Sequence, residues 1–220
     1  MAPAPTLLVV DDHPLFRDAL RRLVAGFWPG AQVHEAADAE GVFALAEAQP
    51  QADLLLLDLT MPGARGFGVL VHLRAQYPAL PVVMVSARDD ADTQRRAFAH
   101  GAVGFLSKSA AAAEIQRTLD GVLAGEPPPA PSAAAPVEAD ERAVAARIAS
   151  LTPAQFRVLS RVAAGLLNKQ IAFELGIGEA TVKAHMGAVL DKLGASNRTQ
   201  AVLMLGRLGL EPPAPIPDED

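Results

Sequence analysis

The chain has 220 residues, of which half are apolar, and it carries a formal net charge of −6. This length fits one large or two small domains, and the apolar content is enough for a buried core rather than wholesale disorder. The absence of cysteine excludes disulfide scaffolds, zinc–thiolate sites, iron–sulfur clusters and thiol catalysis. No apolar run approaches the ~20 residues of a membrane helix, and no basic residue precedes Arg17. We therefore expect a cytoplasmic protein without a signal peptide or membrane contact.

Proline clusters divide the chain into segments. Nine of the 18 prolines fall in two short stretches, one near the middle of the chain and one at its end. Proline-rich stretches of this kind form extended linkers or tails, so we expect the two halves to be loosely tethered. The predicted segments are a first domain at 1–124, a Pro/Ala-rich linker with a helix at 125–149, a second domain at 150–209 and a disordered acidic tail at 210–220.

Charge separates the second domain from the rest. Residues 151–210 contain seven basic and three acidic side chains and are net positive, whereas the whole chain is acidic. An excess of this size is usually an ordinary solvated surface. It nevertheless makes the second domain the place to look for contacts with nucleic acid.

In the first domain, continuous apolar runs alternate with amphipathic segments. Apolar runs without alternation are typical of strands that are buried on both faces, as in a parallel sheet. Five strands each followed by a helix predict an α/β fold with an open, doubly wound, five-stranded parallel sheet. The expected strands are 7–10, 32–36, 54–57, 82–85 and 102–106, and the expected helices are 14–25, 39–48, 67–76, 90–100 and 110–123.

Polar residues stand at the carboxyl ends of four of these strands, where doubly wound sheets bind their ligands. They are Asp11, Asp12, Asp58, Ser86 and Lys108. Clustered carboxylates repel one another, and a hard divalent cation such as Mg²⁺ relieves that repulsion. A lysine and a hydroxyl beside them could bind an incoming phosphoryl group, and a carboxylate could attack it. Any one of these residues could equally be a turn former or a cap, so the prediction depends on all five together.

The motifs around these residues resemble the receiver domain of two-component response regulators. The resemblance covers about residues 5–123, and it implies a flavodoxin-like fold with Asp58 as phospho-acceptor. It also implies that Asp12, Asp58 and the Thr60 carbonyl bind Mg²⁺ directly, that Asp11 helps through water, and that Lys108 pairs with the phosphoryl group. Ser86 and Phe105 would form the switch pair, although Phe105 replaces a common tyrosine and reads equally well as a core aromatic. The motifs that carry this resemblance are Val10-Asp11-Asp12-His13, Leu57-Asp58-Leu59-Thr60-Met61-Pro62-Gly63 with Gly66, Val85-Ser86-Ala87 and Gly101 to Lys108.

The second domain has the pattern of a helix-turn-helix. Thr152-Pro153-Ala154-Gln155 is a helix start with a threonine cap and a glutamine three residues later. Residues 168–175 and 179–193 form two further predicted helices around the turn Gly176-Ile177-Gly178, and a fourth helix follows. The second helix of such a motif enters the DNA major groove.

The helix over 179–193 has one apolar face and one polar face. Its apolar residues recur at helical spacing from Val182 to Leu193 and belong to the core. The opposite face is small and poor in hydrogen-bond donors, so it reads few base edges. His185 is better read as a structural or phosphate contact than as a metal ligand. The basic residues suited to DNA phosphates are Lys169, Lys183, Lys192 and Arg198, each of which could also be a solvated surface residue.

These motifs resemble the LuxR-type helix-turn-helix, and a receiver joined to it is typical of the NarL/FixJ type of response regulator. The resemblance rests on Leu151-Thr152-Pro153, Asn168 to Ala172, Thr181 to His185, Lys192-Leu193-Gly194 and Asn197 to Val202. It implies a sensor histidine kinase as partner, promoter DNA contacts from Lys169, Thr181, Lys183 and Ala184, and a homodimer formed through the last helix. Gln155, Gly178 and Gly187 depart from the family pattern, so we expect weak DNA binding by the monomer.

Three functional hypotheses follow. The leading one is a transcription regulator controlled by phosphorylation of Asp58. The second keeps DNA binding but makes it independent of phosphate, which the intact acidic residues disfavour. The third is a Mg²⁺ phosphatase, which would need a second acid where Thr60 stands; we therefore expect no enzyme.

Overall fold

The N-terminal domain is built on a parallel sheet. The computed structural model describes residues 4–61, 64–126 and 137–209. Five strands pair in the order β2-β1-β3-β6-β7, all of them parallel. The doubly wound α/β fold predicted from the apolar runs is thereby confirmed. The strands are β1 (Thr6–Val10), β2 (Gln32–Ala36), β3 (Leu54–Asp58), β6 (Val82–Ser86) and β7 (Gly104–Ser107).

Alternate residues of the central strands pack into two separate hydrophobic cores, one on each face of the sheet. Leu7 and Val9 of β1 pack with α1 (Pro14–Phe27) and α5 (Ala112–Leu123) on one face. Leu8 and Val10 pack on the other face, where the helices are α2 (Ala39–Ala48), α3 (Gly68–Gln76) and α4 (Ala91–Ala99). Because side chains alternate along a strand, a run without polar residues is what a sheet covered on both faces requires.

Several helix and strand ends in this domain differ from the predicted ones by one or two residues, and one pair of strands was not predicted. The last strand begins at Gly104 rather than Ala102, because the Ala102 N–H closes the turn after α4 on the Ala97 carbonyl at 3.0 Å. A short antiparallel hairpin, β4 (Thr60–Met61) with β5 (Ala64–Arg65), follows β3 and was not predicted. Two-residue strands carry too little periodicity to be read from the sequence.

The C-terminal domain is all helical. Its helices are α6 (Ala139–Ala149), α7 (Pro153–Ala163), α8 (Asn168–Leu175), α9 (Glu179–Leu193) and α10 (Arg198–Arg207). The predicted capping box is present, since Gln155 N–H donates to Thr152 Oγ1 and Thr152 N–H donates to Gln155 Oε1. Gly176 ends α8 with a φ of +64°, a conformation that suits glycine and turns the chain into α9.

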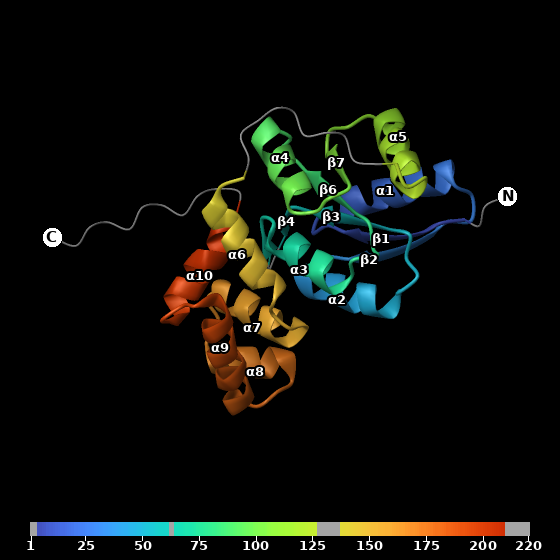
Figure 1. Cartoon of the computed structure of the whole chain (residues 1–220). Helices are drawn as coiled ribbons and strands as arrows, with labels where there is room; N and C mark the ends of the chain where they lie inside the picture. The colour runs from blue at the N-terminus through green and yellow to red at the C-terminus, as the bar shows by residue number, and fades with distance from the viewer. Residues whose placement is uncertain (1–3, 62–63, 127–136, 210–220) are drawn as a thin grey trace.

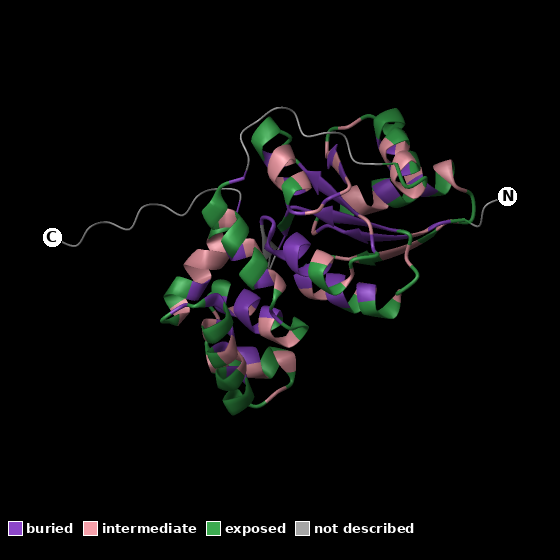
Figure 2. Ribbon diagram, in the orientation of Figure 1, coloured by how far each residue is buried: buried purple, intermediate pink, exposed green. Residues whose placement is uncertain are grey.

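The two domains share an aromatic cluster. The helices α6 to α10 gather beside α3, away from α1 and α5 (Figure 1). The fully buried imidazole of His72 in α3 stacks on Phe156 of α7, with ring centroids 4.4 Å apart. Phe43 of α2 meets both rings edge-on. Buried residues accordingly extend from the sheet into the inner faces of α3 and α7 (Figure 2).

Polar contacts form a second part of this interface. Glu141 of α6 accepts hydrogen bonds from Arg96 Nε at 2.9 Å and pairs with His100 Nε2 at 2.7 Å. The Phe67 N–H, at the start of α3, donates to the Leu208 carbonyl at 2.7 Å. The expectation of loose tethering was therefore wrong for the described residues, because the side chains of the folded domains, rather than the linker, hold them together. The proline-rich stretch at 127–136 and the acidic tail at 210–220 lie outside the described residues.

Candidate functional site

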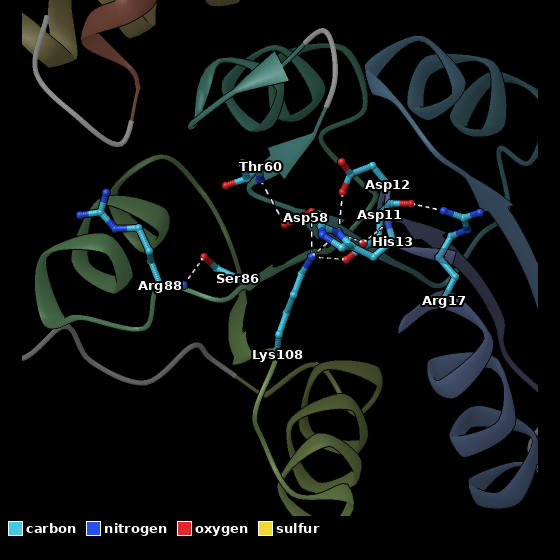
Figure 3. Close-up of polar contacts among 9 residues, drawn as sticks. All are labelled: Asp11, Asp12, His13, Arg17, Asp58, Thr60, Ser86, Arg88 and Lys108. Carbon is cyan, nitrogen blue, oxygen red and sulfur yellow. Dashed lines mark hydrogen bonds and ion pairs between the residues drawn. The ribbon is translucent and has the colours of Figure 1, made fainter. Parts of the chain in front are cut away.

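An acidic pocket lies at the carboxyl edge of the sheet. Asp11 and Asp12 follow β1, and Asp58 is the last residue of β3 (Figure 3). The two strands are neighbours, but their onward connections lead to opposite sides, so a crevice opens between them. Asp11 and Asp58 are buried to 1% and 3% exposure, whereas Asp12 is half-buried. The structure thus brings together the three carboxylates that the sequence singled out.

Lys108, just beyond β7, completes this pocket. Its ammonium lies 2.7 Å from Asp11 Oδ2 and 2.9 Å from Asp58 Oδ2. The Lys108 N–H of the backbone donates to the Ser86 carbonyl, which fixes the lysine relative to β6. A cation held between two buried carboxylates partly compensates their repulsion.

Burial and pairing shift the pKa values in this pocket. Burial raises the pKa of Asp58 above its ordinary value, against the opposing effects of Lys108 and the Thr60 N–H. Burial also disfavours the charged form of Lys108, but its bonds to Asp11 and Asp58 outweigh that cost and raise the pKa of Lys108. The lysine therefore remains a cation at neutral pH.

Thr60 contacts Asp58, and Ser86 ends the neighbouring strand β6. The Thr60 N–H donates to Asp58 Oδ1 at 3.1 Å, which orients the carboxylate. Ser86, at the end of β6, is buried, and its Oγ accepts the Arg88 N–H at 2.9 Å. Phe105 is half-buried on β7 and lines a hollow of about 200 Å³ between α4 and α5. Ser86 belongs to the pocket edge, whereas Phe105 faces the α4–β7–α5 side of the domain.

Two residues at the pocket received no role from the sequence. Arg17 of α1 donates a hydrogen bond to the Asp11 carbonyl, and the His13 ring lies between Asp12 and Lys108 (Figure 3). His13 directly follows the acidic pair Asp11-Asp12 in the sequence, so its place in the pocket could have been predicted from that position. Arg17 is one helical turn further on, and only the start of α1 brings it back to the strand end.

The donor set fits a divalent cation. Asp11, Asp12, His13 and Asp58 each offer one ligand atom, and these atoms all lie within 4.8 Å of one another. Asp11 Oδ2 and Asp12 Oδ1 are buried and accept no well-formed hydrogen bond, being held only by ion pairs with Lys108 and His13. Carboxylate oxygens are the ligands that Mg²⁺ prefers, so the acidic residues are consistent with Mg²⁺ binding.

The second surface of interest is the outer face of α9. Thr181, Lys183 and Ala184 are exposed on its first turns, and His185 is half-buried. Lys183 lies 3.4 Å from Glu179 on the same helix, and Lys169 is exposed near the start of α8. Exposed residues cover the outer turns of α8 and α9 (Figure 2). Among the residues that the structure describes, this face of the helix-turn-helix is left exposed.

Two residues that were predicted to contact DNA instead donate hydrogen bonds to carbonyl groups of the protein. Lys192 Nζ donates to the Ser150 carbonyl at 2.7 Å, which ties the end of α9 to the end of α6. Arg198 donates to the Leu166 carbonyl and is half-buried. Both side chains therefore have a structural partner in this state, and their contact with DNA stays a prediction.

Comparisons with known proteins decide the family. A family described as response regulator receiver domain matches residues 7–120, and one described as bacterial regulatory proteins, luxR family, matches residues 149–205. The chain belongs to the LuxR family of two-component response regulators. It is 39% identical to the glycerol metabolism activator of Pseudomonas putida over 91% of this chain and 94% of that one. It is 33% identical to the nitrate/nitrite response regulator protein NarL of Escherichia coli K12 over 90% and 93%.

Solved structures agree with this assignment. A LuxR-family two-component response regulator from Aurantimonas is 32% identical over 56% of this chain and 88% of its own, with a TM-score of 0.53. The regulator RcsB in its DNA complex covers 93% of this chain at 19% identity and a TM-score of 0.53, which shows the fold alone. The two family models and the curated relatives make this chain a DNA-binding transcription regulator. In the part of the chain that the structure describes, no helix is long and apolar enough to cross a membrane.

Proposed function

We propose that this response regulator acts in the cytoplasm, and that phosphorylation of Asp58 by a sensor histidine kinase, with Mg²⁺ as cofactor, controls how it binds promoter DNA. The observation that supports this most is the position of Asp58. It ends the central strand β3, is 3% exposed, pairs with Lys108 and lies beside Asp11 and Asp12. The proposal assigns the receiver function to residues 1–124 and DNA binding to 150–209.

The chain's own residues would act on the phosphoryl group as follows. An Asp58 oxygen attacks phosphorus, a new oxygen–phosphorus bond forms, and the bond to the kinase imidazole nitrogen breaks and leaves its electron pair on that nitrogen. Lys108 stabilises the negative charge on the phosphoryl oxygens, and the Thr60 N–H keeps the carboxylate oriented. Asp12, Asp58 and the Thr60 carbonyl would hold Mg²⁺, and Asp11 would help through water. When bound, Mg²⁺ neutralises charge on the carboxylates and the phosphoryl oxygens.

Ser86 and Phe105 would transmit the modification. In the present state Ser86 Oγ is engaged by the Arg88 N–H. A phosphoryl group on Asp58 offers a stronger, charged acceptor, to which the hydroxyl can donate. A shift of Ser86 moves the end of β6, and Phe105 pairs in register with Met84 of that strand. The half-buried ring is therefore free to repack when the strand moves.

A short path that includes backbone hydrogen bonds leads from Asp58 to the domain interface. The Leu59 N–H donates to Val85, the Gly66 N–H donates to Leu59, and the Phe67 N–H donates to Leu208 at the end of α10. The Phe67 ring also lies under Arg96, which bonds Glu141 of α6. We propose that phosphorylation at one end of this path weakens domain docking at the other.

Undocking would release the helix that the family uses for dimerisation. The end of α10 contacts the receiver domain, and Leu205 reaches so close to Gly68 that a Cβ there would lie 2.9 Å from Leu205 Cδ1. A freed α10 could pair two copies, and two copies would place two α9 helices on successive half-sites of promoter DNA. The proposed contacts are Lys169, Thr181, Lys183, Ala184 and His185, together with Lys192 and Arg198 if their present bonds open.

Intact mass after incubation with a small phosphodonor and Mg²⁺ tests the acceptor. We expect one phosphoryl adduct on the wild-type chain and none on Asp58→Ala, while Asp53→Ala, at the start of β3, keeps the adduct. DNA binding measured with and without the donor then tests control. A folded wild-type chain that gains no adduct and binds DNA equally in both conditions would instead be a phosphate-independent regulator.

A further inference from the structure

His13 is the polar residue of the acidic pocket that the proposed reaction leaves unused. Its backbone N–H donates to Asp11 Oδ1 at 2.7 Å, and this bond folds the chain back over the pocket. The ring nitrogen Nδ1 then lies 2.6 Å from Asp12 Oδ1 and 3.0 Å from Asp11 Oδ1. The ring is 64% exposed, and the polar contacts that the described residues give it all come from this pocket.

We propose that His13 Nδ1 is a nitrogen ligand of the divalent cation held by this pocket, and that it shifts the site's preference from Mg²⁺ towards first-row transition ions such as Mn²⁺. This inference rests on the proposed metal-dependent function of the same pocket. It concerns only which atoms of the chain bind the ion.

The spacing of the four side chains supports this assignment. An octahedral ion with ligand bonds of about 2.1 Å separates adjacent ligands by about 3 Å and opposite ones by about 4.2 Å. The contacts of Nδ1 with the two carboxylates, at 2.6 and 3.0 Å, lie near the first value, and no pair in the set exceeds 4.8 Å. A single ion can therefore be reached by the imidazole together with the carboxylates.

The polar surroundings of Nδ1 conflict when no ion is present. A carboxylate at 2.6 Å favours a proton on Nδ1, whereas the Lys108 ammonium at 3.3 Å favours an Nδ1 without one. One ring nitrogen cannot satisfy both. A cation beside Nδ1 resolves the conflict, because the neutral nitrogen and the Asp12 carboxylate then share one partner. Lys108 keeps its ion pairs with the remaining oxygens, Asp11 Oδ2 and Asp58 Oδ2.

The donor type sets the expected selectivity. Mg²⁺ takes oxygen ligands, whereas divalent first-row transition ions also accept imidazole, and Mn²⁺ has the lowest affinity of that series. The oxygen ligands of Asp12, Asp58 and Thr60 with one imidazole form a mixed set that still binds Mg²⁺ but favours Mn²⁺ more than an all-oxygen pocket does. Loss of the imidazole should therefore weaken Mn²⁺ more than Mg²⁺.

Pulsed electron paramagnetic resonance of Mn²⁺ bound to the full chain reads the ligand directly. We expect ¹⁴N modulation in the wild-type spectrum that changes to the ¹⁵N pattern when only histidine is ¹⁵N-labelled. The modulation should disappear in His13→Ala and remain in His185→Ala, the matched histidine control on α9. In titrations, the ratio of the Mg²⁺ to the Mn²⁺ dissociation constant should fall about 10-fold in His13→Ala, the range typical of removing support from a metal site.

The outcomes separate this inference from the function on which it rests. Suppose that Mn²⁺ competes with Mg²⁺ for binding and no longer binds Asp58→Asn, but its spectrum shows no modulation from histidine nitrogen. His13 is then not a ligand, although the proposed metal site is still supported. The same holds if the modulation persists in His13→Ala. If neither ion binds the folded wild-type chain, both the inference and the metal-dependent function are wrong.

Discussion

The imidazole of His72 lies parallel to the phenyl ring of Phe156, with ring planes 8° apart and centroids separated by 4.4 Å. One ring belongs to α3 of the receiver domain and the other to α7 of the DNA-binding domain. Neither nitrogen of His72 has a hydrogen-bond partner of good geometry, although the Ile148 backbone is close enough to favour the charged ring. Burial outweighs that effect and lowers the pKa of His72 to about 4. Domain docking is therefore coupled to the protonation of this ring.

Acidification should open the two domains. In the open form His72 regains an ordinary pKa of about 6.5, so the open form binds a proton that the docked form rejects. Docking is complete above pH 6.5 and weakens as pH falls from 6.5 towards 4, by about 10-fold at pH 5.5. His100, whose pKa is also lowered by burial, acts in the same direction. Because the chain has no cysteine, a dye pair at Gln51→Cys and Asp191→Cys can report docking by energy transfer.

His72→Phe is the matched test of this effect. Phenylalanine preserves the stacking and cannot take up a proton, so this variant should stay docked at pH 5.5 except for the part contributed by His100. If the variant and the wild-type chain open over the same pH range, then His72 is not the group responsible.

Glu141 should contribute more to docking than its neighbour Asp140. Glu141 is largely buried and joins α6 to Arg96 and His100 of the receiver domain. Asp140, by contrast, is 81% exposed, and its ion pair with Arg207 is longer, at 3.6 Å. Glu141→Gln should weaken docking by about 2 kcal/mol, or roughly 30-fold, because bonds to charged groups are lost in a partly buried place. Asp140→Asn should change energy transfer very little. Equal effects of the two variants would contradict this assignment.

Lys108 should stabilise the receiver domain most when no divalent cation is added. Lys108→Met leaves Asp11 and Asp58 buried without their ammonium, so the melting temperature without Mg²⁺ should fall by several degrees. Added Mg²⁺ should then raise the melting temperature by more than it does for the wild-type chain, because the cation replaces the lost positive charge. Calorimetry with a Mg²⁺ series measures both, and a smaller Mg²⁺ effect in the variant would refute the argument.

Lys183 and Lys192 should differ in what their loss changes. Lys183 is exposed on α9, and its ion pair with Glu179 adds little to stability, so Lys183→Ala should weaken DNA binding without changing the melting temperature. The slope of log affinity against log salt should fall by about 1, as expected for one phosphate contact. Lys192→Ala should lower the melting temperature, because it removes the bond to the Ser150 carbonyl. Identical salt slopes for wild type and Lys183→Ala would exclude that contact.

Local sequence patterns were enough to predict most helices and strands and the acidic pocket. Apolar runs such as Leu54–Leu57 predicted strands buried on both faces, and the chain order placed Asp58 and Asp11 at one sheet edge, because parallel strands end on the same side. The capping box at Thr152 predicted the start of α7, because its bonds join residues only three apart. The positions of the acidic residues relative to strand ends were therefore readable without tertiary information.

Contacts between distant residues were decided only by the tertiary structure. His72 and Phe156 are 84 residues apart, and Arg96 and Glu141 are 45 apart, with a proline-rich stretch between the domains that predicted the opposite arrangement. The sequence around a buried histidine, or around a glutamate on an amphipathic helix, does not indicate which residue it contacts. Periodicity shows which face of a helix is apolar, but it does not show which element packs on that face. By itself the sequence determined the fold of each domain and the chemistry of the acidic pocket, because these follow from local spacing. The docking of the domains, the engagement of Lys192 and the position of His13 among the carboxylates depend on packing in three dimensions.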